Sequence, residues 1–281
     1  MDVVRADVLA RVERFYDAVP RDGARVEEHG PLVLFVRDGA GWPFYARPRL
    51  DATAPPALAD VNAVRARQRE LGLPEAFEWV HEITPDLLAV ARSAGLSVLE
   101  APLMVLDPAH LPDPAALSDA PVRVLDPADP RFAADVAVRR AVAAVGFSNG
   151  GTTRGAAGPA ERDAALPRLD VAALEEEAVR IADGRRISAL AETPDEGALA
   201  SGMAMRVGDA AEIAGVATLP VARRRGLGAA VTAALAHELR AAGTDLVFLS
   251  AGSEEIARVY LRVGFRRVGT ACIAEPAALL G

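Results

Sequence analysis

Apolar positions in the second half of the chain recur in turn with the spacing of helices and of strands. Amphipathic stretches with a period near 3.6 predict helices, and short apolar or β-branched runs predict strands. In chain order the pattern predicts a strand at 122–126, helices at 131–147 and 171–184, strands at 186–192, 198–208 and 211–220, a helix ending before Gly243, a strand at 245–251 and a helix ending before Gly264. With a last pair of strands, this order indicates an α/β (α+β) fold: a mixed twisted sheet flanked by helices.

The last two predicted helices have recognisable ends. Gly243 and Gly264 stand where a glycine can close a helix in a left-handed conformation. Ser253 is the expected N-cap of the second of these helices, because its hydroxyl can accept a hydrogen bond from an unpaired amide of the first turn. Glu254 and Glu255 follow it and suit the positive end of the helix dipole.

Two irregular stretches interrupt the pattern. The first, "DPAHLPDPAALSDAP" at 107–121, is rich in proline and follows an apolar run. It predicts a linker at 107–120 between a first domain at 1–106 and a second domain at 121–281. The second, at 148–167, is rich in glycine and predicts a mobile loop over a site.

The first domain carries a weak copy of the end of the second. A shift of 169 residues places 76–106 on 245–275 and matches their order of strand, helix, glycine and strand. It superposes Thr84 on Ser253. We interpret this as an internal repeat, with an unrelated small α/β domain as the alternative.

Charge and cysteine content narrow the class of protein. The 281 residues carry a formal net charge of −8, which disfavours nucleic acid and anionic membrane surfaces as partners. Cys272 is the only cysteine, so no disulfide can form within the chain, and we interpret it as a residue of a strand core. No apolar run reaches the length of a signal peptide or a membrane span. These observations predict a cytoplasmic protein with no membrane partner.

The stretch "LPVARRRGLGAAV" at 219–231 joins a predicted strand to a predicted helix. The first amides of a helix have no acceptor within it and lie at the positive end of its dipole, so such a loop favours an anion. Gly226 and Gly228 let the backbone approach closely, while Arg223, Arg224 and Arg225 can neutralise charge and donate hydrogen bonds to phosphate oxygens. The loop therefore predicts a phosphate site, with a surface arginine cluster beside an ordinary turn as the alternative.

Two other kinds of phosphate loop do not fit these residues. A dinucleotide fingerprint requires a glycine or alanine where Val231 stands, and an acidic residue at the end of the next strand, where "LVFLS" has none. A Walker loop requires a lysine, and the chain contains none.

The same residues resemble the coenzyme A signature of the GNAT superfamily of acyltransferases, an Arg or Gln, two variable residues, Gly, one variable residue, then Gly or Ala. Arg223, Gly226 and Gly228 fill that signature, and "YLRVGF" at 260–265 is similar to a second GNAT motif. The elements around both motifs follow the order of the family. The resemblance covers residues 121–275 and implies a GNAT-like fold. With the internal repeat, the chain would contain two such domains in tandem.

The resemblance also implies where acetyl-CoA binds. In the family the strand before the loop pairs with the pantetheine arm, which here falls on Val216, Ala217 and Thr218, and an amide of that strand polarises the thioester carbonyl. The pyrophosphate would lie on the amides from Arg224 to Ala229.

Three side chains are candidates for chemistry or contact on the same grounds. Tyr260 matches the tyrosine that protonates the departing thiolate, with a partly buried helix aromatic as the alternative. Glu212 is the candidate base, because strand alternation would put it on one face with Val216 and some GNAT members carry a glutamate there. A solvated carboxylate, with water taking the proton, is the alternative. Ser253 stands where many relatives have an Asn that contacts the cofactor, so this contact is expected to be weaker.

In the repeat register the first domain lacks these groups. Ala91 takes the place of Tyr260, and Pro55 and Pro56 take the place of the phosphate loop, where proline offers no amide. This implies a degenerate GNAT-like domain without a coenzyme A site. Its sheet edge and apolar faces could pack on the second domain, complete an acceptor pocket or form a homodimer.

The sequence thus predicts an acetyl-CoA-dependent N-acetyltransferase. A primary amine of a small molecule or peptide would attack the thioester directly, with no metal, and fold-level analogy does not name this acceptor. A non-catalytic acyl-CoA-binding or sensing module and an assembly protein are the alternatives.

Overall fold

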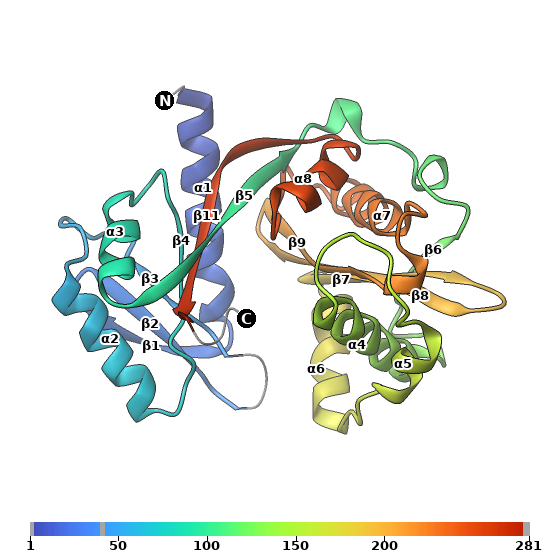
Figure 1. Cartoon of the computed structure of the whole chain (residues 1–281), viewed down its shortest axis with the longest axis horizontal. Helices are drawn as coiled ribbons and strands as arrows, with labels where there is room; N and C mark the ends of the chain where they lie inside the picture. Colours follow the sequence, from blue (N-terminus) through green and yellow to red (C-terminus); the bar gives the residue numbers. More distant parts are fainter. Residues whose placement is uncertain (1–2, 40–42, 278–281) are drawn as a thin grey trace. The chain divides into compact units, whose positions relative to one another are not determined.

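The chain folds into two compact units, which this computed structural model describes at residues 3–39 and 43–277. The first unit comprises residues 1–103 and 267–281, and the second comprises residues 104–266. Strand β5 (Leu96–Leu106) carries the chain from the first unit into the second, and strand β11 (Phe265–Pro276) carries it back (Figure 1). No helix in the described ranges is long and apolar enough to cross a membrane.

The first unit is a sheet with three helices among its described residues. Its strands follow the order β1-β2-β3-β4-β11-β5, in which β3 and β4 are parallel and β4 and β11 are antiparallel. Its core gathers Leu34, Phe77 and Trp79 with Cys272, which pairs with Trp79 across the two strands. Its other elements are α1 (Val3–Arg21), β1 (Ala24–His29), β2 (Leu32–Arg37), β3 (Ala46–Pro48), α2 (Leu58–Glu70), β4 (Phe77–Val80) and α3 (Asp86–Ser93).

The second unit is a sheet with helices on both faces (Figure 1). Its strands follow the order β5-β10-β9-β8-β7-β6, antiparallel from β6 to β9 and parallel between β9 and β10. Its elements are η1 (Pro108–His110), η2 (Pro114–Ala116), β6 (Val122–Val124), α4 (Phe132–Ser148), α5 (Pro159–Ala164), α6 (Val171–Ala182), β7 (Arg186–Thr193), β8 (Gly197–Val207), β9 (Ala210–Thr218), η3 (Pro220–Ala222), α7 (Leu227–Ala241), β10 (Leu246–Ser250) and α8 (Glu254–Leu261).

Neighbouring residues of β8 identify the two faces of this sheet. A Cβ placed on Gly202 would lie 2.8 Å from Val231 of α7, so this face packs on α7. The side chain of the preceding Ser201 points the other way and donates to the carbonyl of Arg139 in α4, at 3.3 Å. Helices α7 and α4 therefore cover opposite faces, as alternation along a strand requires.

The expected mixed sheet flanked by helices is confirmed, and the predicted strands and helices of the second half lie where the pattern placed them up to Gly264. The expected last pair of strands is a single strand, β11. Helix α5 was missed, because six residues inside a glycine-rich stretch are too few to show a helical period.

The structure divides the chain at different points from those expected. The proline-rich residues 107–120 belong to the second unit, where Leu111 and Leu117 pack on its core and the amide of Asp107 donates to the carbonyl of Gly264 at 2.9 Å. The last strand returns to the first unit at Arg267 instead of staying in the second domain. Proline predicts an irregular backbone but does not distinguish a free linker from a packed strap. We call residues 107–118 the strap.

Candidate functional site

Strands β9 and β10 of the second unit diverge after a short parallel ladder. That ladder pairs Ala210–Glu212 with Leu246–Phe248. Strand β9 then runs on to Thr218, paired with β8 along its other edge, whereas β10 ends at Ser250. Because β8 and β10 are the two neighbours of β9, its edge toward β10 beyond Glu212 can offer main-chain groups to a ligand.

A β-bulge lies in β9 just beyond this ladder. Ala214 and Ala217 of β9 oppose Met203 and Ser201 of β8, so three steps along one strand match two along the other. Gly215, within the bulge, has a φ of +62°, a left-handed conformation that glycine adopts without strain. Such a bulge redirects the backbone amides next to it.

Because of the bulge, the side chains of Glu212 and Val216 lie on opposite faces of the sheet, and not on one face as expected. Glu212 pairs with Met205 and so shares the face of Ala217, which lies against α4, where a Cβ on Gly146 would be 2.8 Å from the Ala217 Cβ. Val216 lies on the α7 face. The prediction that alternation puts Glu212 and Val216 on one face is therefore wrong. The extra residue in the bulge shifts the alternation of side chains between the two faces by one position.

The loop between β9 and α7 has the backbone of an anion site. Arg224 has a φ of +65° and Gly226 a φ of +79°, and α7 begins at the next residue. Arg224 is the one non-glycine residue with positive φ in the part of the chain that the structure describes. Left-handed residues in such a turn can aim successive amides at one point, and the first-turn amides of α7, including that of Ala229, have no acceptor in the helix.

The two signature glycines are required for different reasons. A Cβ on Gly226 would stand 1.8 Å from the carbonyl oxygen of Leu117, so the strap leaves no room for a side chain there. A Cβ on Gly228 would lie 3.3 Å from Oγ1 of Thr218, the last residue of β9. The absence of a side chain at Gly226 therefore lets the strap pack against the turn, and its absence at Gly228 lets the end of β9 approach α7.

The Arg223 side chain serves the fold, which corrects the expectation that it would bind phosphate. It is 8% exposed, and its guanidinium donates to the carbonyls of Gly146 and Thr153, both at 3.0 Å, and to that of Asn149. Weaker contacts reach Gly150 and Thr218. Burial lowers the pKa of Arg223 from its usual value.

The other two arginines lie at the surface of the loop in ion pairs. Arg224 donates through Nε to the carbonyl of Thr152 at 3.2 Å, and its Nη2 lies 3.7 Å from Glu255 of α8. Arg225 donates to Glu196 at 3.1 Å. These exposed pairs are weak, so both guanidiniums can exchange partners for a phosphate.

A mobile loop was expected at 148–167, but residues 149–158 of this stretch are hydrogen-bonded to the loop after β9. The amide of Gly155 donates to the carbonyl of Pro220 at 3.2 Å, and that of Val221 to the carbonyl of Ala157 at 3.0 Å. Thr152 also donates to Glu255. A Cβ on Gly158 would lie 2.9 Å from Val221. The glycines that predicted mobility thus permit close approach.

Helix α8 places Ser253 and Tyr260 beside this loop. The Ser253 hydroxyl accepts the amide of Ile256 at 3.2 Å, so the expected N-cap is confirmed. Tyr260 is 8% exposed and packs edge-on against Phe265 at 6.1 Å. Burial raises the pKa of Tyr260 to about 12. Within the described residues, nothing is hydrogen-bonded to its hydroxyl.

A buried charge cluster that the sequence analysis missed lies on the α4 face. Glu177 of α6 accepts from Arg186 of β7 at 3.3 Å and lies 3.5 Å from the guanidinium of Arg139 of α4. Burial lowers the pKa of Arg139 to about 10. Arg186 pairs with Met205, which pairs with Glu212, so the cluster and Glu212 share a row across the sheet. An arginine inside an apolar helix pattern, such as Arg139, was the available signal.

The structure thus brings the end of β9, the left-handed turn before α7 and the start of α8 together, the last two through the Arg224–Glu255 ion pair. It places Glu212 on the opposite face of the sheet from Val216, and the Arg223 guanidinium is hydrogen-bonded to a main-chain carbonyl of α4.

Comparisons with known proteins agree with this geometry. Residues 190–273 match the family model described as "FR47-like protein". A GCN5-related N-acetyltransferase from Kribbella flavida is 22% identical with a TM-score of 0.66, over 96% of this chain and 95% of that one. One from Sphaerobacter thermophilus is 14% identical with a TM-score of 0.55, over 96% and 92%.

A tandem GNAT protein from the clavulanic acid biosynthesis pathway is 16% identical with a TM-score of 0.51, over 88% of this chain and 78% of that one. No curated protein matches the chain. At these identities the likenesses show the fold, and the expected resemblance to GNAT proteins is confirmed.

Proposed function

From a GNAT fold whose residues 190–273 match the FR47-like family, we propose that this chain is an N-acyltransferase that moves an acetyl group from acetyl-CoA to a primary amine. One observation carries the proposal. The gap between β9 and β10 lies on the strand that leads directly into the left-handed turn at the start of α7. An extended arm ending in a phosphate fits a strand edge followed by an anion site.

The donor is bound mainly through backbone groups. The pantetheine arm pairs with β9 at Val216–Thr218, and the pyrophosphate receives amides from Arg224 to Ala229. Arg224 and Arg225 add charge by exchanging Glu255 and Glu196 for phosphate oxygens. Ser253 contributes less, because its oxygen already caps α8.

The amine nitrogen attacks the thioester carbonyl carbon, and the carbon–sulfur bond breaks as the tetrahedral intermediate collapses. An amide next to the β9 bulge stabilises the negative charge that develops on the carbonyl oxygen. Tyr260 stays protonated at neutral pH because of its raised pKa. Since a thiol has an ordinary pKa of about 8.5, its hydroxyl acts first as a hydrogen-bond donor to the departing sulfur.

Glu212 accepts the proton of the amine, directly or through a water. It lies at the last pair of the β9–β10 ladder, where the two strands begin to diverge. Its side chain faces α4, so the acceptor enters from the face that also holds the Arg139–Glu177–Arg186 cluster. The acceptor is a small-molecule or peptide amine.

The test is a calorimetric titration of the whole chain with acetyl-CoA, repeated with Gly228→Val. The added side chain meets Thr218 Oγ1 and occupies the approach to the turn, whereas any side chain at Gly226 would displace the strap even without a ligand. Ala241→Val, at the exposed far end of α7, is the matched control.

We expect one site per chain, a loss of affinity of about tenfold or more in Gly228→Val (about 1.4 kcal/mol) and none in the control. A folded wild type that does not bind acetyl-CoA, or equal affinity in all three proteins, would overturn the proposal. Binding without turnover over a panel of amines would identify a sensing module instead.

A further inference from the structure

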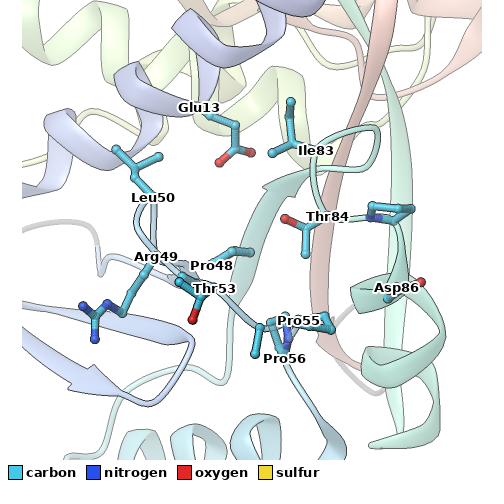
Figure 2. A pocket seen from close by; sticks show the side chains of 13 residues that line it. Glu13, Pro48, Arg49, Leu50, Thr53, Pro55, Pro56, Ile83, Thr84 and Asp86 are labelled. Atoms are coloured by element: carbon cyan, nitrogen blue, oxygen red, sulfur yellow. The ribbon is translucent and has the colours of Figure 1, made fainter. Parts of the chain in front are cut away.

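The first unit contains a pocket of its own, with a volume of about 290 Å³ (Figure 2). Two segments line it, residues 48–56 after β3 and residues 83–86 leading into α3. Glu13 of α1 completes the lining, and Figure 2 shows its carboxylate directed into the space between Leu50 and Ile83. Nothing in the proposed acyl transfer uses this pocket.

The pocket lies at the position that corresponds to the donor site of the second unit. The repeat shift of 169 residues places 48–56 on 217–225, the end of β9 and its loop, and places 83–86 on 252–255, the start of α8. Both segments follow a parallel strand pair, β3 with β4 in the first unit and β9 with β10 in the second. The repeat therefore places this pocket where the second unit has its proposed donor site.

The groups that line this pocket suit a cation and not an anion. Pro55 and Pro56 stand where the phosphate loop offers amides. The Glu13 carboxylate accepts the amide of Val80 at 2.6 Å through one oxygen and the guanidinium of Arg47 through the other. It is 3% exposed, and burial raises its pKa. The lining therefore presents carboxylate oxygens, which accept hydrogen bonds, and few amides that could bind a phosphate or carboxylate group.

The remaining charges around the pocket are also acidic on balance. Arg49, a basic residue of the lining, forms ion pairs with Asp51 at 2.8 Å and Glu28 at 2.7 Å. Asp86 opens α3 at the pocket and carries a further carboxylate. Of the charged residues that line the pocket, two are carboxylates, Glu13 and Asp86, and one is an arginine, Arg49.

The walls of the pocket are apolar. Leu50 and Ile83 remain 51% and 41% exposed, although they are large hydrophobic residues, and prolines complete the wall. Thr53 and Thr84 add hydroxyls that can accept hydrogen bonds. A pocket with apolar walls and a few polar groups that converge is the usual form of a small-molecule site.

We propose that this pocket binds a small protonated amine with an apolar body, its ammonium group directed to Glu13 and Asp86 and its body against Leu50 and Ile83. The first unit would then have a cation site at the position where the second unit has its proposed anion site. The inference holds whether or not the second unit transfers acetyl groups.

Three probes of one shape test the charge preference: benzylamine, benzyl alcohol and benzoate. Binding to the whole chain is measured by ligand-observed NMR and calorimetry. We expect benzylamine to bind at least about tenfold more tightly than benzyl alcohol, because its ammonium group makes hydrogen bonds in which donor and acceptor are both charged. We expect no binding of benzoate. Equal binding of benzoate, or no binding of benzylamine, would overturn the proposal.

Variants at the mouth of the pocket locate the site. Glu13→Gln would leave Arg47 buried without a charged partner and could unfold the unit, so two exposed positions are better suited. Ala54→Phe fills the pocket, and Asp86→Asn removes one charge without changing shape. Both should weaken benzylamine binding, Ala54→Phe to below detection.

The matched controls lie at exposed positions of the second unit, Ala172→Phe and Asp119→Asn, and should bind benzylamine as the wild type does. Benzylamine binding that survives Ala54→Phe would refute the assignment.

Discussion

Replacing Arg223 by Met should loosen the second unit around the phosphate loop. The guanidinium is 8% exposed and makes three close hydrogen bonds, to the carbonyls of Gly146, Asn149 and Thr153. Each hydrogen bond from a charged donor contributes about 1.5–3 kcal/mol, but water can reach the part-buried carbonyls once the guanidinium is gone. The contact to Gly146 is buried, and its carbonyl would be left without this donor. We therefore expect the free energy of unfolding to fall by about 2–4 kcal/mol.

The assay combines urea unfolding followed by circular dichroism with hydrogen exchange resolved by peptide. The amides of residues 149–158 should exchange faster in Arg223→Met, because this segment loses its main attachment to the loop. Arg224→Met, at a side chain that is 65% exposed, is the control and should change stability by less than about 0.5 kcal/mol. Equal stability and equal exchange in the two variants would refute the structural role of Arg223.

Three further predictions concern single titratable groups. Tyr260→Phe should lower kcat about a hundredfold or more and leave acetyl-CoA affinity unchanged, because its hydroxyl donates a hydrogen bond to the sulfur as negative charge develops there. Equal kcat would exclude that role. Cys272, whose pKa burial raises to about 12, should stay unreactive toward a thiol reagent at pH 8 until the protein is denatured, and rapid labelling of the folded chain would contradict its burial. Arg67 lowers the pKa of Glu27 to about 2 from an ordinary 4.5, so this pair stabilises the first unit above pH 4.5 and the stabilisation is lost as the pH falls toward 2. Acid titrations of Glu27→Gln should lack that component, and an unchanged acid transition would argue against it.

Several parts of the site could be read from the chain because their signals are local. Ser253 indicates the start of a helix, because its hydroxyl accepts a hydrogen bond from the amide three residues later. The turn at Arg224–Gly226 follows from a glycine pair placed between an apolar strand and a helical pattern. Such signals depend on neighbouring residues, so they survive without knowledge of the tertiary structure.

Other parts depend on residues far apart in the chain. A bulge in β9 changes which face of the sheet the following side chains point to, and only the pairing with β8 reveals this bulge. The role of Arg223 depends on carbonyls that lie 70 and 77 residues earlier in the chain, and a guanidinium suited to phosphate is equally suited to these. The requirement for Gly226 comes from Leu117 of a strap whose prolines predicted a linker.

The sequence alone determined most of the order of strands and helices in the second half, the likeness to GNAT proteins and the position of the turn between β9 and α7, since these follow from periodicity and short-range backbone preferences. The tertiary structure decided which face of β9 carries Glu212, which arginines remain at the surface, where the two units divide and that the first unit has a pocket with a buried carboxylate. These features arise from packing between distant segments, and close packing selects one arrangement among several that the local pattern allows equally.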